Sequence, residues 1–319
     1  MLKIVFLDAK NVGQIGNFKI IEKLGQLEIH GTTPPDKVIE RSIGKDIIIT
    51  SKVIIDKNVI DQLPDLKLIC VAATGTNNID VKYAGKKGIQ IKNVAGYSTE
   101  SVAQLTFSML LCLVNRPYFF DEFVKSGAYT NSNVFTYLGK PFWELHHKQI
   151  GIIGLGTIGR RVAQIAHVLG MDVVFYSTSG LNNNTNYKRF DLDTLLSTSD
   201  VVSIHAPFNE HTKGLINYEK IKIMRPCSIL LNTGRGGIIV EADLARALSE
   251  GLIGGAGLDV FENEPINTDN PLLKITDKDK LLLSPHVGWT SVEARQRLID
   301  KIAKNIEDFR KHLEGTGDH

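Results

Sequence analysis

The chain has 319 residues, of which 43% are hydrophobic and 23% are charged, and its formal net charge is +2. This length indicates two domains, because a single hydrophobic core rarely keeps growing to that size. The small net charge and the lack of a long basic run argue against a nucleic-acid partner, and no apolar stretch is long enough to cross a membrane. The three cysteines lie far apart, which favours neither a disulfide framework nor a zinc site, so we expect no bound metal.

The first part of the chain alternates short β-rich runs with helical segments, which predicts a small α/β unit with a parallel sheet. It begins with a strand instead of a signal peptide, so we expect a cytoplasmic protein. The predicted strands are residues 3–7, 47–50, 68–71 and 89–91, and the predicted helices are 18–24 and 59–63.

A long helix is predicted over residues 98–114, because Thr99-Glu100-Ser101 can cap an apolar periodic run and Pro117 follows its end. Residues 119–145 are expected to be less regular. The stretch from Pro117 to Leu145 is rich in aromatic residues. Aromatic side chains are enriched in interface cores, so these residues favour a homodimer; the alternative is that they pack on their own domain.

A second α/β unit is predicted from Gln149 onward, again with strands and helices in alternation. Its strands are residues 150–153, 173–176, 201–205, 229–232, 257–260 and 281–284, and its helices are 160–169, 193–197 and 241–250. The closing helix, residues 291–313, is expected to cross back and cover the first domain, although it could instead finish the second.

A glycine-rich turn, Gly154-Leu155-Gly156-Thr157-Ile158-Gly159, lies between a predicted strand and a predicted helix. In a dinucleotide site, the first glycine permits the tight turn, the second lets the backbone approach the pyrophosphate and the third permits close helix–strand packing. The free N–H groups at the helix amino terminus, at Thr157 and Ile158, would then face the phosphates. The alternative is a glycine-rich turn without a ligand.

The residue after the second strand departs from the usual dinucleotide-binding pattern, and this residue normally determines the choice of cofactor. An acidic residue usually ends the second strand and binds the ribose hydroxyls, but here Ser177 follows Tyr176. No arginine stands there either, and Lys188 and Arg189 are expected on the solvated surface. We therefore predict a relaxed preference between NAD(H) and NADP(H).

Three later residues could perform chemistry on a keto acid. Arg235 follows a strand in a glycine-rich turn, and its guanidinium fork matches a carboxylate. His286 could exchange a proton, and Glu264 could hold the second ring nitrogen and stabilise the charged imidazole. Each residue alone could be an ordinary turn or strand-end residue.

Over essentially its whole length, the chain resembles the D-isomer-specific 2-hydroxyacid dehydrogenases, and most of all their glycerate dehydrogenase (hydroxypyruvate reductase) branch around residues 71–102. The resemblance rests on an ordered set of segments. They are residues 73–80, 101–103, 154–159, 203–207, 232–236, 258–265 and 286–289.

The resemblance implies roles for matching residues. Arg235 would bind the substrate carboxylate and polarise the carbonyl, His286 would be the acid/base with Glu264 as its partner, and backbone N–H groups around Thr74, Gly75 and Thr76 would hold the carboxylate. The remaining cofactor contacts would come from Ser177, Ala206, Thr212, Thr233, Gly234, Asp259 and Gly288. Thr233 and Asp259 would orient the nicotinamide carboxamide, while Ala206 and Thr212 would line the adenosine side. Gln104 stands where a glutamate is usual.

These inferences predict two Rossmann/flavodoxin-like parallel-sheet domains with a cleft between them. Residues 1–98 plus 288–319 would form the substrate domain, and residues 99–287 the dinucleotide-binding domain. The expected activity interconverts a small 2-keto acid, hydroxypyruvate or glyoxylate, and its D-2-hydroxy acid. The alternatives are a dinucleotide-sensing corepressor-like scaffold and a short phosphoglycerate dehydrogenase. A formate dehydrogenase is disfavoured because Glu264 is an acid and not an amide.

Overall fold

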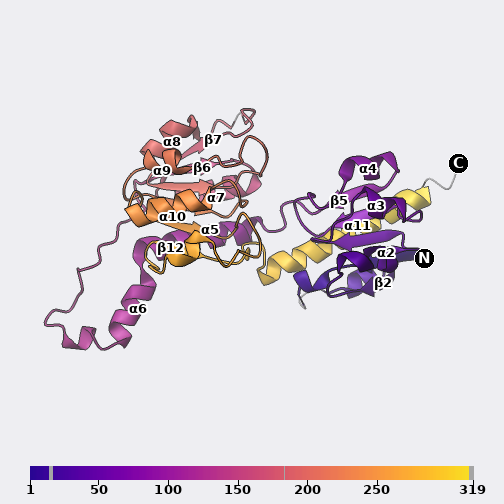
Figure 1. Cartoon of the computed structure of the whole chain (residues 1–319), viewed down its shortest axis with the longest axis horizontal. Coiled ribbons are helices and arrows are strands. Elements are labelled where there is room, and N and C mark those ends of the chain that lie inside the picture. Colours follow the sequence, from indigo (N-terminus) through magenta and orange to yellow (C-terminus); the bar gives the residue numbers. More distant parts are fainter. Residues whose placement is uncertain (14–16, 183, 316–319) are drawn as a thin grey trace. The chain divides into compact units, whose positions relative to one another are not determined.

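The computed structural model describes residues 1–13, 17–182 and 184–315, and it divides into two compact units (Figure 1). The first unit joins Met1–Ser98 to Trp289–His319, and the second is Thr99–Gly288. Among the described residues, we find no helix with the length and hydropathy needed to cross a membrane. The predicted class of two parallel-sheet α/β domains is confirmed.

The first unit is built on a five-stranded parallel sheet with the order β2-β1-β3-β4-β5, which is the flavodoxin-like order. Its strands are β1 (Leu2–Phe6), β2 (Gly25–Ile29), β3 (Ile47–Thr50), β4 (Leu68–Val71) and β5 (Gln90–Asn93). Its α-helices are α1 (Lys19–Glu22), α2 (Val38–Ser42), α3 (Lys57–Asp61), α4 (Val81–Lys86) and α11 (Val292–Gly315).

Alternate residues of each central strand enter two separate cores, as a parallel sheet covered on both faces requires. In β1, Ile4 and Phe6 pack with apolar residues of α1 and α11, whereas Val5 packs on the opposite face with residues of α2, α3 and α4. The long helix α11 therefore belongs to the first unit, because its Leu298 and Ile302 complete that unit's core.

The second unit contains a seven-stranded parallel sheet with the order β12-β11-β10-β9-β6-β7-β8. Counted from β6, this is the Rossmann order 3-2-1-4-5-6 with one further strand. Its strands are β6 (Gln149–Ile153), β7 (Asp172–Tyr176), β8 (Lys188–Arg189), β9 (Val201–Ile204), β10 (Ile229–Asn232), β11 (Gly255–Leu258) and β12 (Leu281–Leu283). Its α-helices are α5 (Thr99–Asn115), α6 (Pro117–Lys125), α7 (Thr157–Val168), α8 (Leu192–Thr198), α9 (Tyr218–Lys222) and α10 (Glu241–Glu250).

Helices cover both faces of this second sheet. Residues of α5 and α7 form one core with β6 and β10, and residues of α8, α9 and α10 form the other. The order of strands reverses between β6 and β9, and ligands of such sheets bind at the carboxyl ends of the strands beside that point.

Several elements differ from the sequence prediction. The strands β2 and β8 and the helices α2, α4 and α9 are not predicted, and α7 and β11 begin three and two residues earlier than expected. The helix α6 occupies part of a stretch expected to be irregular. Pro117 starts α6 instead of merely following α5, because proline suits the first position of a helix. Arg116, with φ 50°, adopts the left-handed conformation that separates the two helices.

Candidate active site

The glycine-rich turn connects β6 to α7 with the geometry that a pyrophosphate site needs. Gly154 has φ +92°, and a Cβ there would lie 2.7 Å from the Ala206 backbone. A Cβ on Gly159 would lie 2.3 Å from the carbonyl oxygen of Gly154, so this glycine allows the helix to pack on the turn. By contrast, a Cβ on Gly156 would meet nothing within 4 Å, so the backbone there faces open space.

This turn fits a dinucleotide, because the three glycines play the three separate roles that such a site requires. Thr157 and Ile158 open α7, where the first N–H groups of a helix have no intrahelical acceptor and can bind phosphate. The buried Ala206 lies against the turn, as its contact with the Gly154 position indicates. The fully buried Thr212 accepts from the Asn209 N–H and donates to the Pro207 carbonyl, so its side chain holds the loop after Ala206.

In the turn after β7, Ser177 stands where an acidic residue usually binds the ribose hydroxyls. Ser177 is buried, and its carbonyl accepts the Gly180 N–H at 3.2 Å. The guanidinium of Arg189 donates to the Gly180 carbonyl at 3.0 Å. Asn182 donates from its side chain to the Leu155 carbonyl at 2.9 Å, which links this segment to the glycine-rich turn. Arg189 is exposed, as expected, and it also contacts this turn. The sequence analysis assigns no role to Asn182.

A row of hydrogen-bonded polar side chains lies at the carboxyl ends of β9 and β10. The Thr233 hydroxyl lies 2.9 Å from the Thr106 hydroxyl and 3.4 Å from Nδ1 of His205, whose Nε2 contacts the Ser203 hydroxyl. Although part of His205 remains exposed, both of its ring nitrogens are enclosed, and burial lowers its pKa to about 3. The imidazole is therefore neutral and acts here as a hydrogen-bonding group that fixes Thr233.

Asp259 organises the segment that carries His286. Its carboxylate is 1% exposed and accepts from the Ser284 hydroxyl at 2.5 Å and from the N–H groups of Val287 and Gly288 at 2.8 and 2.7 Å. The His286 N–H donates to the Asp259 carbonyl at 2.8 Å. Gly288, which one of these bonds joins to Asp259, is the last residue of the second unit.

Arg235 lies in a turn that its neighbours hold on two sides. The Asn232 side chain donates to the Arg235 carbonyl and accepts from the Gly234 N–H, and Nη1 of Arg235 donates to the Gly234 carbonyl. A Cβ on Gly236 would lie 1.7 Å from the Phe261 carbonyl oxygen, so glycine is required for this loop to approach the loop after β11. Asn232 is a positioning residue to which the sequence analysis assigned no role. It could have been noticed as a polar residue at the end of an otherwise apolar strand.

His286 and Glu264 are brought together, although 22 positions separate them. Nδ1 of His286 lies 2.7 Å from a carboxylate oxygen of Glu264, and the other oxygen accepts the Phe261 N–H at 3.2 Å. Both side chains remain partly exposed. His286 adopts a left-handed backbone conformation, with φ 54°. A carboxylate at Nδ1 selects one tautomer and leaves Nε2 for another partner.

The predicted carboxylate-binding segment, residues 74–76, lies in the first unit, after β4. The Thr74 hydroxyl donates to the Val94 carbonyl, and the Asn93 side chain donates to the Thr74 carbonyl. Within the part of the chain that is described, the N–H groups of Gly75 and Thr76 have no hydrogen-bond acceptor. These two N–H groups are therefore available to an anion.

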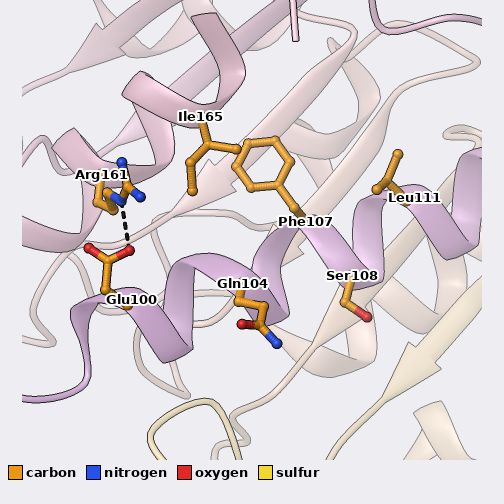
Figure 2. A pocket seen from close by; sticks show the side chains of 7 residues that line it. All are labelled: Glu100, Gln104, Phe107, Ser108, Leu111, Arg161 and Ile165. Atoms are coloured by element: carbon orange, nitrogen blue, oxygen red, sulfur yellow. Dashed lines mark hydrogen bonds and ion pairs between the residues drawn. The ribbon is translucent and has the colours of Figure 1, made fainter. Parts of the chain in front are cut away.

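A separate surface hollow lies between α5 and α7, and none of the predicted site residues lines it (Figure 2). An ion pair between Arg161 and Glu100 closes one end, and Gln104 lies along α5 beside Phe107. Gln104, which stands where a glutamate is usual, thus belongs to this hollow and not to the strand-end site.

Known proteins are similar to this chain in both sequence and fold. The family model described as "D-isomer specific 2-hydroxyacid dehydrogenase, NAD binding domain" matches residues 107–288. A hydroxypyruvate reductase of Blautia hydrogenotrophica is 37% identical over 317 residues and 97% of each chain. A glycerate dehydrogenase of Methylorubrum extorquens is 35% identical over 308 residues and 96% of each chain.

Among solved structures, an acyclic imino acid reductase in complex with NADPH and D-arginine superposes with a TM-score of 0.84 at 28% identity, covering 98% of both chains. The likeness in sequence extends over both units, and the family model covers the unit that holds the glycine-rich turn, Arg235, Glu264 and His286. The chain therefore belongs to the D-isomer-specific 2-hydroxyacid dehydrogenase family.

Proposed function

We propose that the protein reduces a small 2-keto acid to its 2-hydroxy acid, in the D configuration where the product is chiral, with hydroxypyruvate or glyoxylate as the favoured substrate. The observation that carries this proposal is the contact of 2.7 Å between Nδ1 of His286 and Glu264, in the unit that also holds the glycine-rich turn and Arg235. An oriented imidazole, a guanidinium and a dinucleotide site are the groups that reversible reduction of a keto acid needs.

The cofactor is NAD(H) or NADP(H), and its nicotinamide supplies the hydride when it is bound. Residues 154–159 bind the pyrophosphate, and Thr233 and Asp259 orient the nicotinamide end. His286 holds a proton at Nε2 and gives it to the keto oxygen, while Glu264 stabilises the charged ring before transfer and keeps its orientation. In the oxidative direction, the same nitrogen accepts the proton.

Arg235 binds the substrate carboxylate through its planar fork and stabilises negative charge on the carbonyl oxygen. The free N–H groups of Gly75 and Thr76 hold the carboxylate from the first unit, as the resemblance implies. In this proposal the first unit is the substrate domain and the second is the dinucleotide-binding domain.

The choice of substrate rests on the relatives named hydroxypyruvate reductase and glycerate dehydrogenase, which are 37% and 35% identical to this chain. Glyoxylate is smaller and presents the same 2-keto acid group to Arg235. We also propose a cytoplasmic location, because the three cysteines are free thiols, as is usual in a reducing compartment.

The variant His286→Ala tests the proposed role of the imidazole. We expect turnover of hydroxypyruvate to fall roughly 100-fold or more, because a positioned general acid contributes about that much. Equilibrium binding of the reduced cofactor should stay within about threefold, a change of less than one kcal/mol. His167→Ala, at an exposed histidine of α7, is the matched control and should behave as the unchanged enzyme. Near-normal turnover by His286→Ala would contradict the assignment.

A further inference from the structure

The segment after β7 lacks a carboxylate that could bind a ribose diol. Residues 177–181 are Ser, Thr, Ser, Gly and Leu, and the Gly180 N–H closes a tight turn onto the Ser177 carbonyl. A carboxylate at this point would bond the adenosine ribose hydroxyls and repel a 2′-phosphate. This turn does neither, so a phosphate meets no repulsion from it.

An arginine reaches the same turn from the neighbouring edge strand. Arg189 ends β8 and pairs in register with Phe175 of β7, which places it beside the carboxyl end of that strand. Its guanidinium donates one hydrogen bond, at 3.0 Å, to the Gly180 carbonyl. In the described residues Arg189 forms no ion pair with a carboxylate, so its charge and its remaining N–H donors are available to a ligand.

The turn and the pyrophosphate site are joined by side-chain bonds. Asn182 donates from its side chain to the Leu155 carbonyl at 2.9 Å, and its N–H donates to the Ser177 hydroxyl at 3.3 Å. Leu155 stands between Gly154 and Gly156 of the glycine-rich turn. The segment that carries the Arg189 contact is thereby held next to the backbone that binds the cofactor phosphates.

We propose that Arg189 binds the 2′-phosphate of NADP(H) and gives this protein a preference for NADP(H) over NAD(H). This inference rests on the proposed function, because it assigns the adenosine end of the same cofactor site. The sequence led us to expect a relaxed cofactor preference, because no arginine stands next to Ser177. The contact of Arg189 with this turn replaces that expectation. A guanidinium binds a phosphate through charge-assisted and often bidentate hydrogen bonds, and the second strand of a dinucleotide fold is where such an arginine selects the phosphorylated cofactor.

Lys188 is the other cation on β8, and it provides a matched control. Successive residues of a strand point to opposite faces, and Nζ of Lys188 lies 4.9 Å from the centre of the Phe190 ring. Lys188 has the same charge as Arg189 and stands next to it, but no described contact joins its side chain to the turn at residues 177–180. A general effect of positive charge would depend on both residues, whereas a specific contact depends on Arg189 alone.

The test is equilibrium binding of two probes, adenosine 2′,5′-bisphosphate and adenosine 5′-monophosphate, measured by titration calorimetry at fixed ionic strength. The probes differ only in the 2′-phosphate, and neither undergoes the reaction. We expect the unchanged protein to bind the bisphosphate about 10- to 100-fold more tightly, the range for hydrogen bonds to a charged group. The preference should decrease as salt is added, because Arg189 is exposed.

Arg189→Gln removes the charge and keeps a side-chain donor for the Gly180 carbonyl, so the turn is retained. In this variant the two probes should bind within about threefold of each other, with affinity for the monophosphate unchanged. Lys188→Ala should keep the preference of the unchanged protein. Equal binding of the probes by the unchanged protein, or a preference that survives in Arg189→Gln, overturns the inference. Turnover of 2-keto acids tests the proposed function separately. If the enzyme reduces a 2-keto acid but binds the two probes equally, only the role of Arg189 is contradicted.

Discussion

The contact between His286 and Glu264 determines which ring nitrogen can meet a substrate. Because Glu264 lies at Nδ1, the proton to be transferred is carried on Nε2. Asp259 holds the backbone on either side of this histidine, and His205 holds Thr233 nearby on the same sheet edge. The reacting groups are thus fixed by polar residues that need not touch the substrate.

Glu264→Gln tests this pairing through the pH dependence of activity. The neutral amide no longer stabilises the charged imidazole. Reduction of the keto acid requires that charged form, so the pH profile of its rate should move toward lower pH than in the unchanged enzyme. Glu262→Gln, at the neighbouring glutamate, should leave the profile in place. Superimposable profiles for Glu264→Gln and the unchanged enzyme would count against the pairing.

The sequence predicts Arg235, Glu264 and His286 as a set, because each follows a strand and the carboxyl ends of parallel strands share one edge. It does not predict the location of Arg189. That location depends on the pairing of β8, a strand of two residues, with β7. A strand of two residues is too short to show an alternating hydrophobic pattern, and both residues of β8 are exposed.

At the scale of elements, the strands of both cores follow directly from their apolar runs, and β3, β4 and β10 begin and end as predicted. The helix α6 does carry apolar residues at helical spacing, at Phe119, Phe120, Phe123 and Val124, although none of its residues is buried. It was missed because Pro117 was interpreted as the end of the preceding helix, whereas proline also suits the first position of a new one.

The exposed aromatic segment that begins with α6 predicts a homodimer. Figure 1 shows α6 and the chain after it extending away from the sheet of the second unit. Phe135 and Leu138 are 91% and 83% exposed, although the rings of Phe123 and Tyr137 pack within the segment in a tilted arrangement, 4.4 Å between ring centres. An apolar surface of this kind is typical of an interface, so we propose that a second copy of the chain covers it.

Molecular mass in solution, measured by sedimentation at micromolar concentration, tests this proposal. We expect twice the chain mass for the unchanged protein and a shift toward the monomer for Leu138→Asp, because a charge would be buried without a partner. Val168→Asp changes an 84% exposed residue at the end of α7 and should leave the dimer intact. A monomeric unchanged protein would contradict the proposal.

At the scale of the whole molecule, the chain builds one sheet, leaves it through α5, builds the second and returns through α11. The return was predictable, because the apolar positions of the last helix recur at helical spacing and Leu298 and Ile302 complete the core of the first unit. The substrate's third carbon group could not be predicted, because the motifs in the sequence concern only the 2-keto acid group that the candidate substrates share.

Steady-state reduction of a panel of keto acids, with NADH and NADPH supplied separately, tests the proposed activity. The panel contains hydroxypyruvate, glyoxylate, pyruvate and phosphohydroxypyruvate, together with the amide of pyruvate. We predict the highest kcat/KM for hydroxypyruvate or glyoxylate, formation of the D-hydroxy acid from each keto acid whose product is chiral, and little activity on the amide, which lacks the carboxylate that Arg235 binds. Failure to reduce any 2-keto acid with either cofactor, or equal activity on pyruvate and its amide, would contradict the account.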